Sequence, residues 1–125
     1  MASAQVTRED VSRRIWRFSG IAADGRIIGF EFSAPEGATD TTPFKLSGII
    51  GRDSEQCDYF VDDPTVSRVH AELTFSQELG VQIRDLASTN GTFIDGREVT
   101  DDYQPLQTGS ELQIGEVSLS VSIRK

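Results

Sequence analysis

The strongest constraint on the fold of this chain is a two-residue alternation of apolar and polar side chains. It is clearest in Val117–Arg124, where four aliphatic residues alternate with three serines and an arginine. The segments Trp16–Ser19, Ile28–Ser33 and Ala71–Ser76 repeat the pattern. Because successive side chains of a β-strand point to opposite faces, each segment is predicted to be a strand with one buried face and one solvated face.

Turn signals separate these predicted strands. Asp24–Gly25, Asn90–Gly91 and Asp95–Gly96 are dipeptides that tolerate positive φ and close tight hairpins. The segments Glu36–Thr42 and Asp62–Thr65 are typical of longer loops, and no segment keeps a helical period over three turns. Short strands joined by turns predict an all-β, antiparallel β-sandwich.

Length and composition predict one domain inside the cell. The 125 residues suit a single domain at Ile15–Lys125, preceded by a flexible N-terminal tail at Met1–Arg14, which lacks an apolar stripe. The single cysteine, Cys57, cannot form an internal disulfide and suits a reducing compartment. Apolar stretches are too short to span a membrane, and the N-terminus lacks a secretion signal, so we expect a cytoplasmic protein.

The charge of the chain argues against nucleic acid as a partner. Its 12 basic and 20 acidic residues give a formal net charge of -8. Affinity for nucleic acid depends largely on Lys and Arg that neutralise phosphates. A local basic pocket remains compatible with this charge, because distant exposed charges are screened at physiological ionic strength.

Three polar clusters follow predicted strands and lack a simple structural explanation. They are Gly51–Arg52, Ser67–His70 and Asp85–Thr92. Loops gather at the two ends of a sandwich, where a rigid scaffold can direct their side chains at a ligand. If the three clusters share one end, two guanidinium groups, hydroxyls and an amide converge. These donors suit a phosphate group, which Arg binds through two parallel hydrogen bonds.

In order and spacing, the three clusters followed by Gly96 resemble the signature of the forkhead-associated (FHA) domain, a phosphothreonine-binding family. The loop Asp62–Val66 also looks like that family, and the resemblance covers about Ile15 to Ile123. It implies a sandwich of about eleven strands that binds phosphothreonine peptides through loops at one end. The implied module is not an enzyme and uses neither a cofactor nor a metal.

The resemblance also implies roles for single residues. Arg52 and Ser67 are expected to contact the phosphate, and Arg68 to add positive charge beside it. Thr89 is expected to hydrogen-bond near the phosphothreonine, and Asn90 to hold the main chain of the peptide. The expected partners are a phosphothreonine-containing protein and a functionally linked Ser/Thr kinase, with no membrane. The residues expected to support the binding loops are Gly51, His70, Gly91 and Gly96.

Two other functions have some support in the residues. Ser67, His70 and Asp85 are the ingredients of a hydrolytic triad, but no nucleophile-elbow glycine pattern surrounds the serine. The main alternative is a protein assembly module that uses the surface of the sandwich independently of phosphate. Loss of the partner on phosphatase treatment would distinguish a phosphothreonine reader from such a module.

Three smaller expectations concern loops and the tail. Asn90–Gly91 is expected to form a hairpin turn, and Asp62–Asp63 to be a solvated pair of loop carboxylates. Thr7 precedes an acidic residue by three positions, a pattern read by some domains of the FHA family. A phosphorylated Thr7 could therefore occupy the pocket of its own or a neighbouring molecule, although an inert tail is the simpler expectation.

Overall fold

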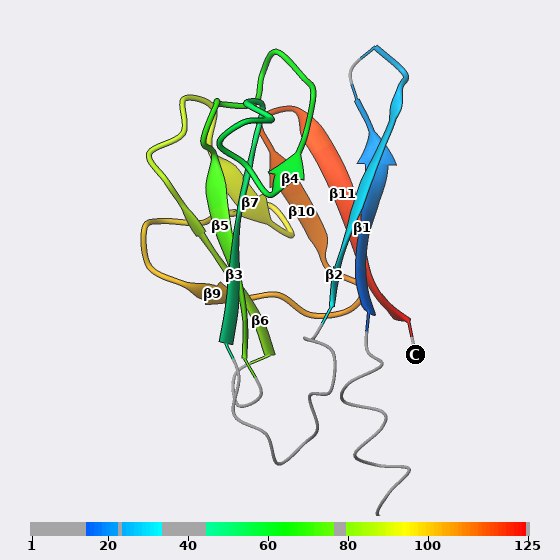
Figure 1. Ribbon diagram of the computed structural model, residues 1–125, viewed down its shortest axis with the longest axis vertical. Coiled ribbons are helices and arrows are strands. Elements are labelled where there is room, and N and C mark those ends of the chain that lie inside the picture. Colours follow the sequence, from blue (N-terminus) through cyan, green and yellow to red (C-terminus); the bar gives the residue numbers. More distant parts are fainter. Residues whose placement is uncertain (1–14, 23, 34–44, 77–79, 125) are drawn as a thin grey trace, which may run out of the picture.

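The structure is a two-sheet β-sandwich (Figure 1). It is a computed structural model that describes residues 15–22, 24–33, 45–76 and 80–124. These ranges contain no helix, and hence no helix that could cross a membrane. Their eleven strands are β1 (Ile15–Ile21), β2 (Ile27–Ser33), β3 (Lys45–Gly51), β4 (Tyr59–Phe60), β5 (Ala71–Ser76), β6 (Gly80–Asp85), β7 (Thr92–Ile94), β8 (Arg97–Glu98), β9 (Gln104–Pro105), β10 (Glu111–Ile114) and β11 (Val117–Arg124).

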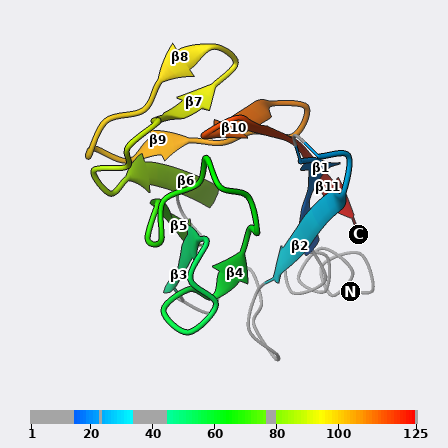
Figure 2. The same cartoon turned by 90° about the horizontal axis from the view of Figure 1, so that it is seen from above.

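The strands form two sheets that face one another (Figure 2). One has six strands in the order β2-β1-β11-β10-β7-β8, and the other has five in the order β4-β3-β5-β6-β9. The predicted all-β sandwich of about eleven strands is confirmed. The long strands β1 and β11 pair over seven residues although they lie at opposite ends of the described chain, which places β1 inside the first sheet, between β2 and β11.

One strand pair departs from the antiparallel pattern. β4 runs parallel to β3, with Ile50 opposite Tyr59 and Gly51 opposite Phe60. The loop after β3 folds back on itself, because the carbonyl oxygen of Asp53 accepts hydrogen bonds from the backbone N–H groups of residues 56 and 57. The chain then returns beside β3 in the same direction, so β4 is a short parallel edge strand.

The alternation seen in the sequence determines which side chains fill the core. In β11, Val117, Leu119 and Val121 are at most 2% exposed, whereas the serines between them are exposed. The rings of Phe18 and Phe30 stack at a centroid distance of 4.8 Å, and Phe30 stacks on Tyr59 at the same distance. Since Tyr59 belongs to the other sheet, these rings join the two layers. Burial raises the pKa of Tyr59 to about 12.

The three predicted turn dipeptides have two different outcomes. Asp24–Gly25 joins β1 to β2 and Asp95–Gly96 joins β7 to β8, both antiparallel pairs, so these hairpins are confirmed. The hairpin predicted at Asn90–Gly91 is wrong. This dipeptide lies in the loop from β6 to β7, and these strands belong to different sheets. Gly91 supplies positive φ (+89°) as the dipeptide predicts, but the chain uses it to cross between layers.

Strand pairing places the three polar clusters at the same end of the sandwich. Ile50 at the end of β3 pairs with Ala71 at the start of β5, and Ala71 pairs with Asp85 at the end of β6. The loops that follow β3, precede β5 and follow β6 therefore emerge together. This is the upper end of the molecule in Figure 1.

Candidate functional site

The segment Thr65–Ser67 is the centre of the candidate site, because both other clusters hydrogen-bond to it. Arg52 donates its backbone N–H to the carbonyl oxygen of Ser67 at 2.9 Å and its side-chain Nε–H to the carbonyl oxygen of Val66 at 2.9 Å. The Nε bond orients the guanidinium group. It leaves the terminal Nη groups without a hydrogen bond to any part of the chain that the structure describes.

The third cluster reaches the same segment from the other side. The backbone N–H of Thr89 donates to Ser67 Oγ at 3.0 Å, and Asn90 Nδ2 donates to the carbonyl oxygen of Thr65 at 2.8 Å. Arg52, Thr89 and Asn90 are thus all hydrogen-bonded to the segment Thr65–Ser67, to which Ser67 itself belongs. The side chains of Arg52, Ser67 and Asn90 therefore lie close together, whereas Thr89 contributes its backbone N–H to this arrangement.

His70 links the second and third clusters from below the surface. Its side chain is fully buried, with Nδ1 accepting from the Ser67 backbone N–H at 3.0 Å and Nε2 lying 2.9 Å from the Gly91 carbonyl oxygen. Since a carbonyl can only accept, Nε2 carries the proton and the imidazole is neutral. Burial lowers the pKa of His70, which preserves this neutral form.

The geometry also excludes the hydrolytic triad. The Nδ1 of His70 accepts from the backbone N–H of Ser67 rather than from its hydroxyl. The carboxylate of Asp85 accepts hydrogen bonds from Ser88 and Thr92. A triad needs a direct chain from hydroxyl to imidazole to carboxylate. That chain is not formed here.

Asp85 instead holds the third loop closed. Its Oδ1 accepts from Ser88 Oγ at 2.5 Å and from Thr92 Oγ1 at 2.7 Å, and its Oδ2 accepts from the Ser88 backbone N–H at 3.0 Å. Partial burial raises the pKa of this carboxyl group, but the hydrogen bonds outweigh burial and the net pKa is lowered. The residue before Ser88, Ala87, has φ of +57°, so the loop is tightly turned. The loop-closing role of Asp85 was not predicted.

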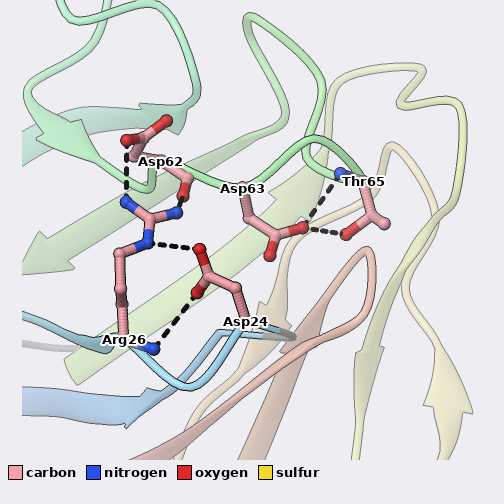
Figure 3. A network of polar contacts seen from close by, with 5 residues as sticks. All are labelled: Asp24, Arg26, Asp62, Asp63 and Thr65. Atoms are coloured by element: carbon pink, nitrogen blue, oxygen red, sulfur yellow. Dashed lines mark hydrogen bonds and ion pairs between the residues drawn. The ribbon is translucent and has the colours of Figure 1, made fainter.

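The expectation that Asp62 and Asp63 form a solvated pair is wrong for Asp63. Its side chain is 1% exposed and accepts hydrogen bonds from the Thr65 backbone N–H at 2.9 Å and Thr65 Oγ1 at 2.5 Å (Figure 3). Thr65 Oγ1 in turn accepts from the Glu116 backbone N–H at 2.9 Å. Burial of the carboxylate is possible because Thr65 supplies donors, which stabilises the segment on which the site is built.

Asp62 belongs to a second contact that the sequence did not reveal. Arg26, in the turn between β1 and β2, reaches over to this loop (Figure 3). Its guanidinium lies 2.8 Å from Asp62 Oδ2, also donates to the Asp62 carbonyl oxygen, and lies 2.6 Å from Asp24 Oδ2. The first hairpin therefore supports the loop that precedes Thr65. No local pattern relates positions 26 and 62, so only the tertiary structure shows it.

The four glycine and histidine positions expected to support the loops are not all at the site. Gly51 is buried, and a Cβ atom there would clash with the Arg68 carbonyl oxygen and lie 2.7 Å from Cys57 Sγ. Gly91 and His70 lie in the hydrogen-bonded loops described above. Gly96 forms the β7–β8 turn at the opposite end of β7 from Gly91, so the structure does not bring it to these loops.

Arg52 and Arg68 present positive charge at the surface of the site. Both are exposed, and no ion pair within the described ranges engages either guanidinium group. They share the lining of an open depression of ≈ 290 Å³. Guanidinium groups, a hydroxyl and an amide are the kinds of donors that suit an oxyanion. Among the described residues, no cluster of His, Cys, Asp and Glu is suited to a metal ion.

Residues 48–115, more than half of the chain, match the family model of the FHA domain. The chain belongs to the FHA domain family. The predicted family is therefore confirmed, and with it a phosphothreonine-binding module that is not an enzyme. The matched range includes Arg52, the segment Thr65–Ser67 and Asn90, so it contains all three loops of the site.

Two relatives of this FHA domain are regulators by name. The oxoglutarate dehydrogenase inhibitor of Corynebacterium efficiens is 46% identical over 69 residues, which cover 55% of this chain and 46% of that protein. The glycogen accumulation regulator GarA of Mycolicibacterium smegmatis is 46% identical over 63 residues, covering 50% of this chain and 37% of that protein. The match thus spans less than half the length of either relative.

Solved structures show the same fold. The N-terminal FHA domain of S. cerevisiae Rad53p, in complex with a phosphothreonine peptide, superposes with a TM-score of 0.69 at 24% identity, covering 88% of this chain and 94% of that one. The FHA domain of CT664 from Chlamydia trachomatis has a TM-score of 0.67 at 23% identity, covering 89% and 99%. The likeness extends well beyond the range matched by the family model.

Proposed function

We propose that this FHA domain recruits partner proteins by binding a phosphothreonine in the site centred on Thr65–Ser67. Arg52 and Ser67 contact the phosphate, and Arg68 contributes charge from the rim. The observation that carries the proposal is that Arg52, Thr89 and Asn90 all hydrogen-bond to the segment Thr65–Ser67, while the Nη groups of Arg52 make no hydrogen bond within the described part of the chain.

The hydrogen bonds already made leave the right groups free for a phosphopeptide. Ser67 Oγ accepts from the Thr89 backbone N–H, so its hydroxyl proton can be donated to a phosphate oxygen. Asn90 uses one Nδ2–H for the carbonyl oxygen of Thr65, and its Oδ1 and second N–H form no further hydrogen bond with the residues that the structure describes. One donor and one acceptor match the C=O and N–H of a peptide main chain. Asn90 therefore sets the register of the peptide, and the Thr89 side chain borders the phosphothreonine.

The proposed biological setting is Ser/Thr kinase signalling in the cytoplasm. A domain that binds phosphothreonine requires a kinase that phosphorylates the threonine. The free thiol of Cys57 suits a reducing compartment. The names of the two bacterial relatives, an inhibitor and a regulator, are consistent with a module that acts by binding other proteins. The formal net charge of -8 disfavours nucleic acid as the partner.

Replacement of Arg52 tests the proposal. The variant Arg52→Ala is expected to weaken binding of a phosphothreonine peptide by at least about 2 kcal/mol, or about 30-fold, because a charge-assisted hydrogen-bond pair to phosphate is lost. Arg97→Ala, at an exposed arginine of the distant β8, is the matched control and should bind like the parent. Isothermal titration calorimetry measures the affinity of both variants and of the parent for the peptide. Equal affinity of Arg52→Ala and the parent would show that the phosphate binds elsewhere.

One surface feature favours a second, phosphate-independent contact. Ile21 and Ile27 pair across the β1–β2 hairpin and are 62% and 86% exposed. Exposed aliphatic pairs of this kind occur at protein contacts. Pull-down before and after phosphatase treatment separates the two functions: a partner held by the phosphate site is released, whereas one held by the isoleucine pair is retained.

A further inference from the structure

The depression that contains Arg52 and Arg68 extends beyond the phosphate site to groups that the proposed function does not use. Its other lining residues are Asp53, Ser54, Glu55 and Phe60. Phe60 lies on the edge strand β4 with its side chain 47% exposed, one of three large hydrophobic residues that are exposed in the described ranges. An exposed ring beside a ligand site is available for contact with that ligand.

The depression extends from Arg52, at the phosphate site, toward one side of that site. Along the central segment, Thr65 binds Asn90, Val66 binds Arg52, and Ser67 binds Thr89. Arg68 comes next in the chain and lines the depression, whereas neither Thr65 nor Asn90 does. A peptide that is held by Asn90 and places its phosphate at Arg52 therefore has this depression beside it, on the Arg68 side.

The charges of the lining residues indicate which peptide side chain fits in the depression. In the free protein the two guanidinium groups of Arg52 and Arg68 balance the two carboxylates of Asp53 and Glu55. A bound phosphate carries nearly two negative charges and neutralises the arginines. The carboxylates then remain as the uncompensated charge. Hydrogen bonds from Gln56 and from the Glu55 backbone lower the pKa of Asp53, so this group stays ionised at neutral pH.

We propose that this depression is a subsite for a basic side chain of the bound phosphopeptide, with arginine as the preferred residue. Its guanidinium group lies against the ring of Phe60 and near the carboxylates of Asp53 and Glu55. At exposed sites, a cation–π contact and an ion pair with a carboxylate each add only a modest binding free energy. The subsite therefore selects among phosphopeptides but does not create binding by itself. The inference rests on the proposed phosphothreonine function.

The test uses a set of phosphothreonine peptides with alanine at the flanking positions. Arginine is placed singly at each of three positions on either side of the phosphothreonine, and leucine is placed likewise as the apolar control. Fluorescence anisotropy at low and high salt measures affinity for the parent protein, Glu55→Gln and Phe60→Leu. Circular dichroism and binding of the all-alanine phosphopeptide verify that both variants retain the fold and the phosphate site.

The expected result is an affinity about threefold to tenfold higher for arginine than for alanine at one peptide position, on one side of the phosphothreonine. The gain should shrink in each variant and at high salt, and it should be absent for the unphosphorylated peptide. A preference for leucine, no preference at any position, or an arginine preference that survives in either variant would overturn the subsite. If phosphorylated and unphosphorylated alanine peptides bind equally, the proposed function itself fails.

Discussion

His70 makes the folding stability of this domain depend on pH in a defined direction. The chain has one histidine, and its imidazole is fully buried between Ser67 and Gly91 with a lowered pKa. In the unfolded chain it titrates near its ordinary pKa of 6.5. Below this pH the unfolded state binds a proton that the folded state resists, so stability falls as pH falls. Above pH 6.5 the full stability is present.

The size of the effect follows from proton linkage. Between pH 6.5 and the lowered pKa of the folded state, the loss has an upper limit of about 1.4 kcal/mol per pH unit. Asp85, which lies in the adjoining loop, does not interfere in this window, because its pKa is lowered from an ordinary value of 3.8. Lowering the pH from 7.5 to 5.5 is therefore expected to reduce the free energy of unfolding by about 1 kcal/mol.

Urea denaturation followed by tryptophan fluorescence at several pH values measures this loss directly. Stability is a cleaner readout than phosphopeptide affinity, because the phosphate group itself titrates near pH 6. His70→Gln, which keeps an amide donor and acceptor but does not titrate, is the control and should show no loss over the same range. A parent protein whose stability is unchanged between pH 7.5 and 5.5, or a variant with the same pH dependence, would refute the neutral, buried histidine.

Two further substitutions test how the loops are supported. Gly51→Ala is expected to destabilise the fold by at least about 2 kcal/mol, since the added Cβ clashes with the Arg68 carbonyl oxygen; a thermal melt measures this, and exposed Ser54→Ala in the same loop should melt like the parent. Arg26→Ala should lower stability only slightly, because its ion pairs are exposed, and the loss should shrink in high salt. A loss for Arg26→Ala that is insensitive to salt would mean that packing, not charge, carries the contact.

Much of the fold was readable because local pattern and strand geometry coincide. The alternation in Val117–Arg124 predicted a half-buried strand, and β11 occupies that segment. Asp24–Gly25 and Asp95–Gly96 predicted hairpins because they join strands that pair with each other. Asn90–Gly91 has the same local chemistry, yet its flanking strands pair in different sheets. A turn dipeptide reports its own backbone conformation and not the partners of the strands it joins.

The site divides in the same way. The types and order of Arg52, Ser67 and Asn90 stand in the sequence, and they were sufficient to predict a phosphate-binding cluster and its family. The burial of Asp63, the reach of Arg26 to Asp62 and the position of Phe60 beside two arginines were decided only by the tertiary structure. These contacts depend on which strands pair across long stretches of chain, and strand pairing is settled by the packing of both sheets together. In this protein the local sequence therefore determines which chemical groups are present and in what order. The folded sandwich determines the neighbours and the charge state of each group.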